Sequence, residues 1–212
     1  MKKLIGVICL FICVITAKAQ EEKSQYIRKG LLRSMATISP GIMLKENVST
    51  ISLHGTLEYY LADNVSLRGD SYYFLNGKKN YGRGLIIPDD LYSIAFNHVT
   101  FSGASYHFKT KSHFDPYIAI EPGISIAQAS EKCPPDVTCL LPVWEKTYET
   151  TANPLISTAL GFNFYFQKLF HLFGEARYIS GKYLSNAPSP LSLNELRFSF
   201  GLGFNLNLIK KK

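Results

Sequence analysis

The segment that decides the fold is Leu196-Arg197-Phe198-Ser199-Phe200-Gly201-Leu202-Gly203-Phe204-Asn205-Leu206-Asn207-Leu208. Every second residue in it is a large apolar one, and the residues between are polar or glycine. A period of two over this length predicts a β-strand with one apolar face and one polar or small face. Strands of globular proteins average about 5–6 residues, whereas a tilted strand needs about 9–11 to cross a membrane. The segment therefore predicts a membrane-spanning strand.

The same alternation recurs upstream and predicts eight strands with no helix. They are expected at about 33–44, 51–61, 65–75, 91–108, 118–126, 156–166, 172–178 and 196–208. In the fourth, the apolar phase switches between Phe101 and Tyr106, so we expect a β-bulge near Gly103. The pattern predicts an all-β chain forming an eight-stranded antiparallel up-and-down transmembrane β-barrel.

The connections between these strands alternate in length. Short links follow the second, fourth and sixth strands, at 62–64, 109–115 and 167–171; long links follow the third, fifth and seventh, at 76–90, 127–153 and 180–192. The first link, 45–50, is the short exception on its side. Outer-membrane barrels have short periplasmic turns and longer external loops, so this sorting favours such a barrel over a soluble sandwich.

Aromatic residues are expected to form two girdles, because their rings favour the membrane interface. The predicted periplasmic rim contains Tyr59, Tyr60, Phe108, Phe164, Phe166 and Phe170. The predicted outer rim contains Tyr72, Tyr73, Tyr92 and Tyr178.

The first 19 residues indicate export. Met1-Lys2-Lys3 is a basic start, 4–16 is an apolar run, and Ala17-Lys18-Ala19 is a small-x-small cleavage pattern. We expect a signal peptide at 1–19 and one barrel domain at 20–212, with a retained anchor as the alternative. Cleavage leaves 20 of the 23 basic residues against 16 acidic ones, which does not argue for a nucleic-acid partner. Among cysteines it leaves Cys133 and Cys139, which predict one disulfide.

With the strand Phe173-Gly174-Glu175-Ala176-Arg177-Tyr178, these features resemble the outer-membrane protein β-barrel domain family, the group of small barrels like outer-membrane proteins A and X. The resemblance implies a cell outer-membrane location, contact with membrane lipid and lipopolysaccharide, and insertion by the barrel-assembly machinery. The chain departs from the family at its end, where many members carry an aromatic residue that this machinery recognises. Here either the segment 204–208 serves as that signal or the basic tail is tolerated.

If the apolar face meets lipid, the other face lines the barrel interior. The predicted interior charges are Glu58, Arg68, Asp70, Glu121, Glu175, Arg177, Glu195 and Arg197, with His54 nearby. Eight strands leave room only for side chains, and buried charges must pair. We therefore expect a plug of ion pairs, with Glu175/Arg177 pairing across neighbouring strands with Glu195/Arg197. A proton path or a narrow conductance is the alternative.

No catalytic, cofactor or metal site is expected. Lipid A deacylases and acyltransferases of this barrel type use a His-x-Ser arrangement, and the nearest approach here is His98-Val99-Thr100. We expect no histidine base within reach of a nucleophile, and we place His113 and His171 in solvated turns. The histidines are dispersed, and a single cysteine pair lacks the second pair that a structural zinc site needs.

A specific activity is therefore expected in the external loops. Lys78, Lys79 and Arg83 could contact lipopolysaccharide phosphates, or simply be solvated. The ring Cys133-Pro134-Pro135-Asp136-Val137-Thr138-Cys139 and Trp144 could form an adhesion or receptor surface, or protect the loop from proteolysis. The sequence thus predicts a non-enzymatic barrel serving envelope integrity, adhesion or reception. The alternatives are a lipid A-modifying enzyme and, third, a soluble lipocalin-like carrier.

Overall fold

A computed structural model describes residues 29–79, 92–108, 113–132, 145–184 and 191–208. The strands are β1 Leu31–Met43, β2 Val48–Tyr60, β3 Val65–Lys79, β4 Tyr92–His107, β5 Phe114–Lys132, β6 Glu145–Thr147, β7 Thr151–Tyr165, β8 Phe170–Gly181 and β9 Glu195–Asn207. Within these described ranges, no helix is long and apolar enough to span a membrane. The predicted signal peptide, 1–19, lies outside them.

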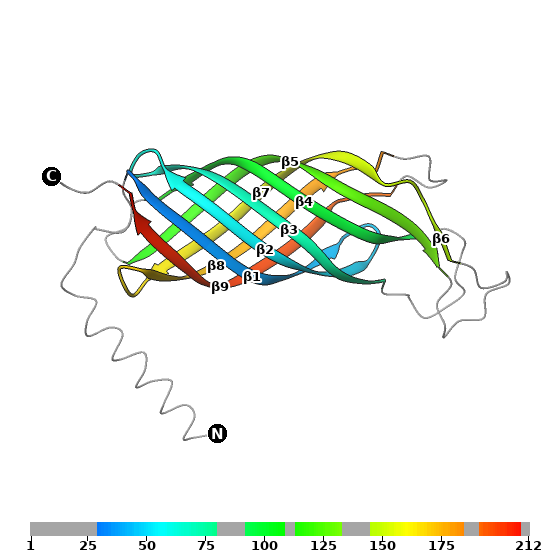
Figure 1. The fold of residues 1–212 in the computed structure, drawn as a ribbon, viewed down its shortest axis with the longest axis horizontal. Coiled ribbons are helices and arrows are strands. Elements are labelled where there is room, and N and C mark those ends of the chain that lie inside the picture. Colours follow the sequence, from blue (N-terminus) through cyan, green and yellow to red (C-terminus); the bar gives the residue numbers. More distant parts are fainter. Residues whose placement is uncertain (1–28, 80–91, 109–112, 133–144, 185–190, 209–212) are drawn as a thin grey trace, which may run out of the picture.

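The eight long strands close into one antiparallel barrel (Figure 1). Each pairs with its neighbours along the chain, β5 pairs with β7, and the pairing of β1 with β9 closes the ring. Closure gives every long strand a paired neighbour on both sides, so the sheet has no open edge facing lipid. The eight-stranded up-and-down barrel predicted from the alternation is confirmed.

The strand boundaries differ from the predicted ones chiefly at the loop end. β5 runs to Lys132 rather than ending near Ile126, and the unpredicted three-residue strand β6 pairs with its last residues. Beyond Ile126 the chain reads Ala127-Gln128-Ala129-Ser130, which has no large apolar residue to mark a face. The main-chain pairing of β5 therefore continues through a segment in which no alternation of apolar residues predicts a strand.

The predicted bulge near Gly103 is wrong. Residues 101, 105 and 107 all point inward and are buried, so the alternation continues through this segment without a change of phase. The apparent switch arose because Phe101 is an aromatic residue of the interior, whereas Tyr106 faces outward. The register irregularity in β4 lies instead between Ile94 and Phe96.

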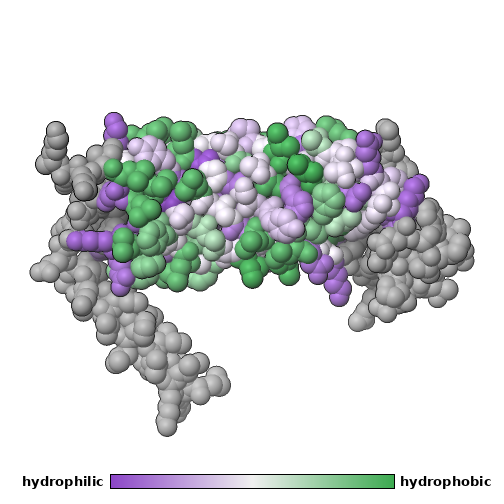
Figure 2. Space-filling view, in the orientation of Figure 1, coloured by the Kyte–Doolittle hydropathy of each residue, from purple (hydrophilic) through white to green (hydrophobic). Residues whose placement is uncertain are grey.

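The apolar residues cover the outside of the barrel. Ile38 is 61% exposed and Phe200 65%, and Figure 2 shows hydrophobic side chains along the wall, with hydrophilic ones gathered mainly towards the two ends. Water would make this surface costly, whereas hydrocarbon matches it. The apolar face points away from the interior, which contradicts the alternative of a soluble carrier with an apolar cavity.

The aromatic girdles are partly corrected. Tyr73, Tyr178, Phe108 and Phe170 face outward, as expected. Tyr60 and Tyr72 point into the barrel and are buried, because their positions in β2 and β3 have inward parity. The side chain of Tyr92 is outside the described part of the chain. Part of the predicted aromatic belt therefore belongs to the interior.

Candidate functional site

The barrel interior gathers the charged residues. All eight predicted interior charges point inward and are at most 5% exposed, and His54 is 1% exposed. Their inward direction follows from strand parity, because each alternates with lipid-facing neighbours. The interior is therefore the candidate site, and its contacts decide what it can do.

A central cluster joins β3, β5 and β8 across the lumen. Arg68 Nε lies 2.7 Å from Asp70 Oδ2, and its Nη2 lies 2.5 Å from Glu175 Oε2. Arg177 Nη2 lies 2.8 Å from Asp70 Oδ2, its Nε lies 3.0 Å from Glu175 Oε1, and its Nη1 contacts Glu121. Two guanidinium groups are thus shared among three carboxylates from separate strands.

The expected cross-strand pairing between β8 and β9 is wrong. Arg177 and Arg197 lie directly opposite each other in the β8–β9 register, so the nearest cross-strand charge is a like one. Each arginine turns to the glutamate two residues earlier on its own strand; Arg197 Nη2 lies 2.7 Å from Glu195 Oε2. The guanidinium of Arg197 also lies 4.4 Å from the centroid of the Tyr72 ring, a cation–π contact.

A second cluster, near the short turns, was missed by the sequence analysis. Arg33 contacts Glu58, and its Nη1 donates to the Tyr165 hydroxyl at 2.7 Å. His107 lies between two carboxylates, with Nε2 2.8 Å from Glu58 Oε1 and Nδ1 2.9 Å from Asp115 Oδ1. Parity alone could have placed Arg33 inside. His107 was obscured by the assumed bulge at Gly103, and Asp115 by its assignment to a turn.

The structure also brings a histidine to a serine, contrary to expectation. His54 Nδ1 lies 2.9 Å from Ser199 Oγ, and its Nε2 lies 2.7 Å from Asp70 Oδ1. These residues come from β2, β9 and β3, so their approach depends on barrel closure and has no His-x-Ser signature. The Ser199 hydroxyl donates to Ser39 Oγ at 3.0 Å and is buried, so it faces other interior side chains.

Solved structures supply the comparison for this geometry. The outer-membrane protein OprG from Pseudomonas aeruginosa matches with a TM-score of 0.59 at 13% identity, covering 86% of this chain and 99% of that one. Neisserial surface protein A matches with a TM-score of 0.51 at 14% identity, covering 89% and 100%. The fold is that of a small outer-membrane β-barrel. No protein-family model and no curated protein matches the sequence.

At the loop end of this outer-membrane barrel, buried apolar side chains lie beside the ion pair of Glu195 and Arg197. Buried apolar side chains from the strand ends and the β8–β9 connection pack together there. The cluster, which we call the apolar cap, includes Met43, Val48, Ile94, Leu155, Ile179 and Leu193. Side chains thus occupy the barrel both at the level of the ion pairs and at the level of this cap.

His171 departs from its predicted position in a solvated turn. It lies in β8, points inward and is fully buried. Gly203 on β9 faces it, and a Cβ there would lie 2.3 Å from the imidazole, so the glycine makes room for the ring. His113 lies just before β5 and is half-buried.

The predicted loop contacts fall mostly outside the described residues. Lys78 is described and exposed near the end of β3. The side chain of Lys79, and all of Arg83, Cys133, Cys139 and Trp144, lie in the undescribed part. The disulfide and the surface contacts therefore stay predictions.

Proposed function

We propose that this outer-membrane barrel is a non-enzymatic scaffold whose external loops carry a surface-interaction role. The observation that supports this is the filling of the lumen: arginine–carboxylate contacts cross it, and the apolar cap lies above them. Such an interior holds the strands in register and leaves the loops as the surface available to partners. Envelope integrity, adhesion and reception are the roles that such a surface would serve.

A loop-exchange experiment tests this proposal. The loops connecting β3–β4, β5–β7 and β8–β9 are replaced one at a time by short turns, and heat-modifiable migration on gels checks that each barrel folds. We expect the barrel to fold in every case, and binding of cells to a surface or host matrix to fall with one exchange. Unchanged surface binding and unchanged envelope permeability in all three variants would contradict a loop-borne role.

The contact of Ser199, His54 and Asp70 favours a second candidate, a lipid A-modifying enzyme. A histidine between a serine and a carboxylate is the arrangement of an activated nucleophile. Against it, the serine hydroxyl is buried and faces the lumen, whereas a lipid ester would approach from the outer wall. Labelling with a serine-reactive fluorophosphonate, with Ser199→Ala as the control, distinguishes the scaffold from the enzyme. Labelling that depends on Ser199, together with an altered lipid A mass spectrum on expression, would favour the enzyme.

Partners follow from the same proposal. We expect membrane lipid and lipopolysaccharide to surround the apolar wall, and the barrel-assembly machinery to insert the chain. Crosslinking during assembly in cells tests the second expectation, since the last strand should reach that machinery first.

A further inference from the structure

The seam that closes the barrel, between β1 and β9, is interrupted at its centre. Residues of the two strands pair in register from Leu31 to Met35 and again from Gly41 to Met43. Both strands are described in full, and within them the positions 36–40 of β1 have no paired partner on β9. The same register holds on both sides of the interruption, so 198–202 are the positions opposite. Main-chain pairing therefore holds the two ends of the seam and not its middle.

Pro40 accounts for part of this interruption. In the register of the seam it stands opposite Phe198, and it has no main-chain N–H to donate across. Two hydroxyl groups of β1 act as donors instead. Ser39 Oγ donates to the carbonyl oxygen of Phe198 at 2.8 Å, and Thr37 Oγ1 donates to that of Phe200 at 2.7 Å. The middle of the seam is therefore closed by side chains, which can change rotamer, in place of the main-chain ladder.

The seam differs from the other interrupted ladder of the described strands. Between β4 and β5 the pairing skips positions 102–103. The two backbones approach closely there, because a Cβ on Gly103 would lie 2.7 Å from the Cα of Glu121. That interruption is short and tightly packed, whereas the one at the β1–β9 seam is longer and bridged by hydroxyl groups.

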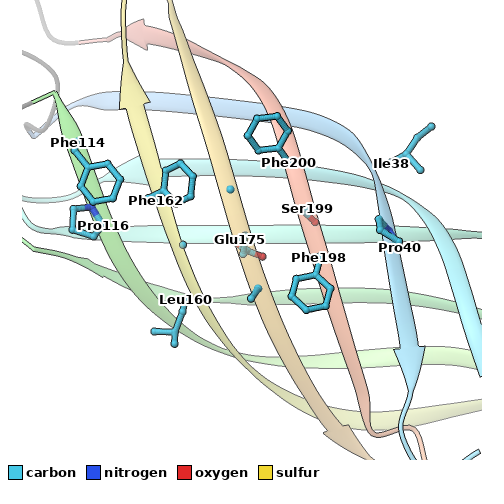
Figure 3. A pocket seen from close by; sticks show the side chains of 13 residues that line it. Ile38, Pro40, Phe114, Pro116, Leu160, Phe162, Glu175, Phe198, Ser199 and Phe200 are labelled. Carbon is cyan, nitrogen blue, oxygen red and sulfur yellow. The ribbon is translucent and has the colours of Figure 1, made fainter. Parts of the chain in front are cut away.

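The seam is also poorly covered where it is interrupted. Thr37 points inward and yet is only half-buried, whereas Ser39, the next inward residue, is buried. The position opposite Thr37 is Gly201, which has no side chain to cover it. On the outer wall, a groove of about 610 Å³ has both Pro40 and Ser199 in its lining (Figure 3). An inward-facing serine thus borders a hollow of the lipid-facing surface.

The barrel interior supports the Ser39 bond from behind. Ser199 donates to Ser39 Oγ at 3.0 Å, and His54 Nδ1 lies 2.9 Å from Ser199 Oγ. His54 Nε2 lies 2.7 Å from Oδ1 of Asp70, a member of the central ion-pair cluster. A continuous chain of contacts therefore connects this cluster with the carbonyl group of Phe198 in the seam.

We propose that the centre of the β1–β9 seam is a lateral slit, which opens between the lumen and the lipid while the main-chain pairs at its two ends hold. Thr37 and Ser39 keep it closed, and Ser199 and His54 hold Ser39 in place. The open form is a minor state, because opening leaves carbonyl groups without donors in hydrocarbon. The slit is a conformational device of the wall, separate from any loop-borne role.

Thiol labelling from within the membrane tests the slit. Cys133→Ser and Cys139→Ser remove the two cysteines outside the predicted signal peptide, and a single cysteine is placed at Ser199 or at Ser157. Both serines point inward and are at most 5% exposed, but the pairing of β7 around Ser157 is continuous on both sides. In lipid vesicles, we expect a bilayer-soluble maleimide to label Ser199→Cys several-fold faster than Ser157→Cys.

Two results of this comparison would overturn the proposal. Equal labelling rates at the two positions would mean that the seam is as closed as the rest of the wall. Labelling of Ser199→Cys by a water-soluble maleimide as fast as by the bilayer-soluble one would mean that the reagent arrives through the lumen.

A pair of proline variants in the Ser199→Cys background tests the missing donor. Pro40→Val supplies an N–H opposite the carbonyl group of Phe198 and should slow labelling several-fold. Pro116→Val is the matched control, because the pairing of β5 with β7 is continuous at that position, and it should leave the rate unchanged. Equal effects of the two substitutions would contradict the assignment of the slit to Pro40.

A pair of threonine variants in the same background tests the hydroxyl closure. Thr37→Val keeps the shape of the side chain but removes the donor to Phe200, so labelling should be several-fold faster. Thr158→Val, at an exposed site on β7, should have no effect. If Thr37→Val fails the heat-modifiability check, Thr37→Ala replaces it. An unchanged rate in the Thr37 variant would show that this hydroxyl does not hold the slit closed.

Discussion

At the scale of single residues, the position of a residue in the alternation predicted whether its side chain faces the lumen or the lipid. It did not predict which residues the side chain contacts. The alternation placed Arg177 and Arg197 inside because each stands between lipid-facing residues. It could not show that they face each other across β8 and β9, since that depends on register. Arg33 and Asp115 were not predicted as interior charges. Both lie near the ends of their strands, where few alternating residues flank them. The two also contact each other across the lumen, although they stand 82 residues apart in sequence.

Arg177 is expected to be the costliest interior charge to remove. Arg177→Met leaves Asp70, Glu121 and Glu175 with a single remaining guanidinium among them, that of Arg68. Breaking such buried pairs costs about 3–5 kcal/mol, so the free energy of unfolding in urea, measured in lipid vesicles, should fall by that order.

Two controls accompany this variant. Lys78→Met, at an exposed site, should change the free energy of unfolding by no more than about 0.5 kcal/mol. Adding Glu121→Gln to Arg177→Met should recover part of the loss, because it removes a carboxylate that keeps only a 3.8 Å contact with Arg68 once Arg177 is gone. A wild-type unfolding curve for Arg177→Met would show that the cross-lumen pairs do not hold the barrel.

Arg197→Met should cost less than Arg177→Met. The guanidinium of Arg197 contacts one carboxylate, Glu195, and the Tyr72 ring, whereas Arg177 contacts three carboxylates. Comparing the two unfolding midpoints in urea checks this order. An equal or larger loss for Arg197→Met would mean that the number of ion pairs does not set the cost.

At the scale of strands, the sequence predicted the number and order of the eight long strands well, because each of them must keep one apolar face in lipid. The prediction of strand boundaries failed where a strand no longer faces lipid. The end of β5 and all of β6 stand at the loop end and carry no apolar stripe. In β4, the inward-facing Phe101 was taken for a lipid-facing residue, and this led to the wrong prediction of a bulge. The alternation of apolar residues therefore predicts only the part of a strand that contacts lipid. How far the strand continues beyond the bilayer is shown by its main-chain pairing and not by its side chains.

Packing between β5 and β7 depends on an inward glycine. The Tyr117 ring covers Gly161, where a Cβ would lie 2.4 Å from its Cζ, and the Tyr117 hydroxyl donates to Glu175 at 2.7 Å. Gly161→Ala should displace this ring and lower the free energy of unfolding by about 1–3 kcal/mol. Gly201→Ala is the matched control, since its nearest neighbours would lie 3.2–3.4 Å away. Equal losses for both would contradict this account.

At the scale of the whole molecule, two kinds of side chain fill the lumen at different levels along the barrel axis: the residues of the ion-pair clusters and those of the apolar cap. Ion pairs occupy the middle and the turn side, whereas on the loop side the apolar cap lies beside the ion pair of Glu195 and Arg197. Composition could not predict this arrangement, because the cap gathers residues from β1, β2, β4, β7, β8 and the β8–β9 connection.

A filled lumen should not conduct ions. In planar bilayers we expect no stable single-channel current from the protein, because water and ions find no continuous path past the apolar cap. Recordings over a range of voltages check this. Reproducible unitary currents would restore the alternative of a narrow conductance.

The central claim is that residues alternate along each strand between facing lipid and facing a buried, charged interior. Single cysteines placed along β9 from 196 to 202, each carrying a nitroxide in lipid vesicles, test it most directly. Accessibility to oxygen, which concentrates in lipid, should be high at 196, 198, 200 and 202 and low at 197, 199 and 201, with little access for a water-soluble nickel reagent at either set. Oxygen accessibility without this two-residue period, or nickel access at the even positions, would contradict the claim.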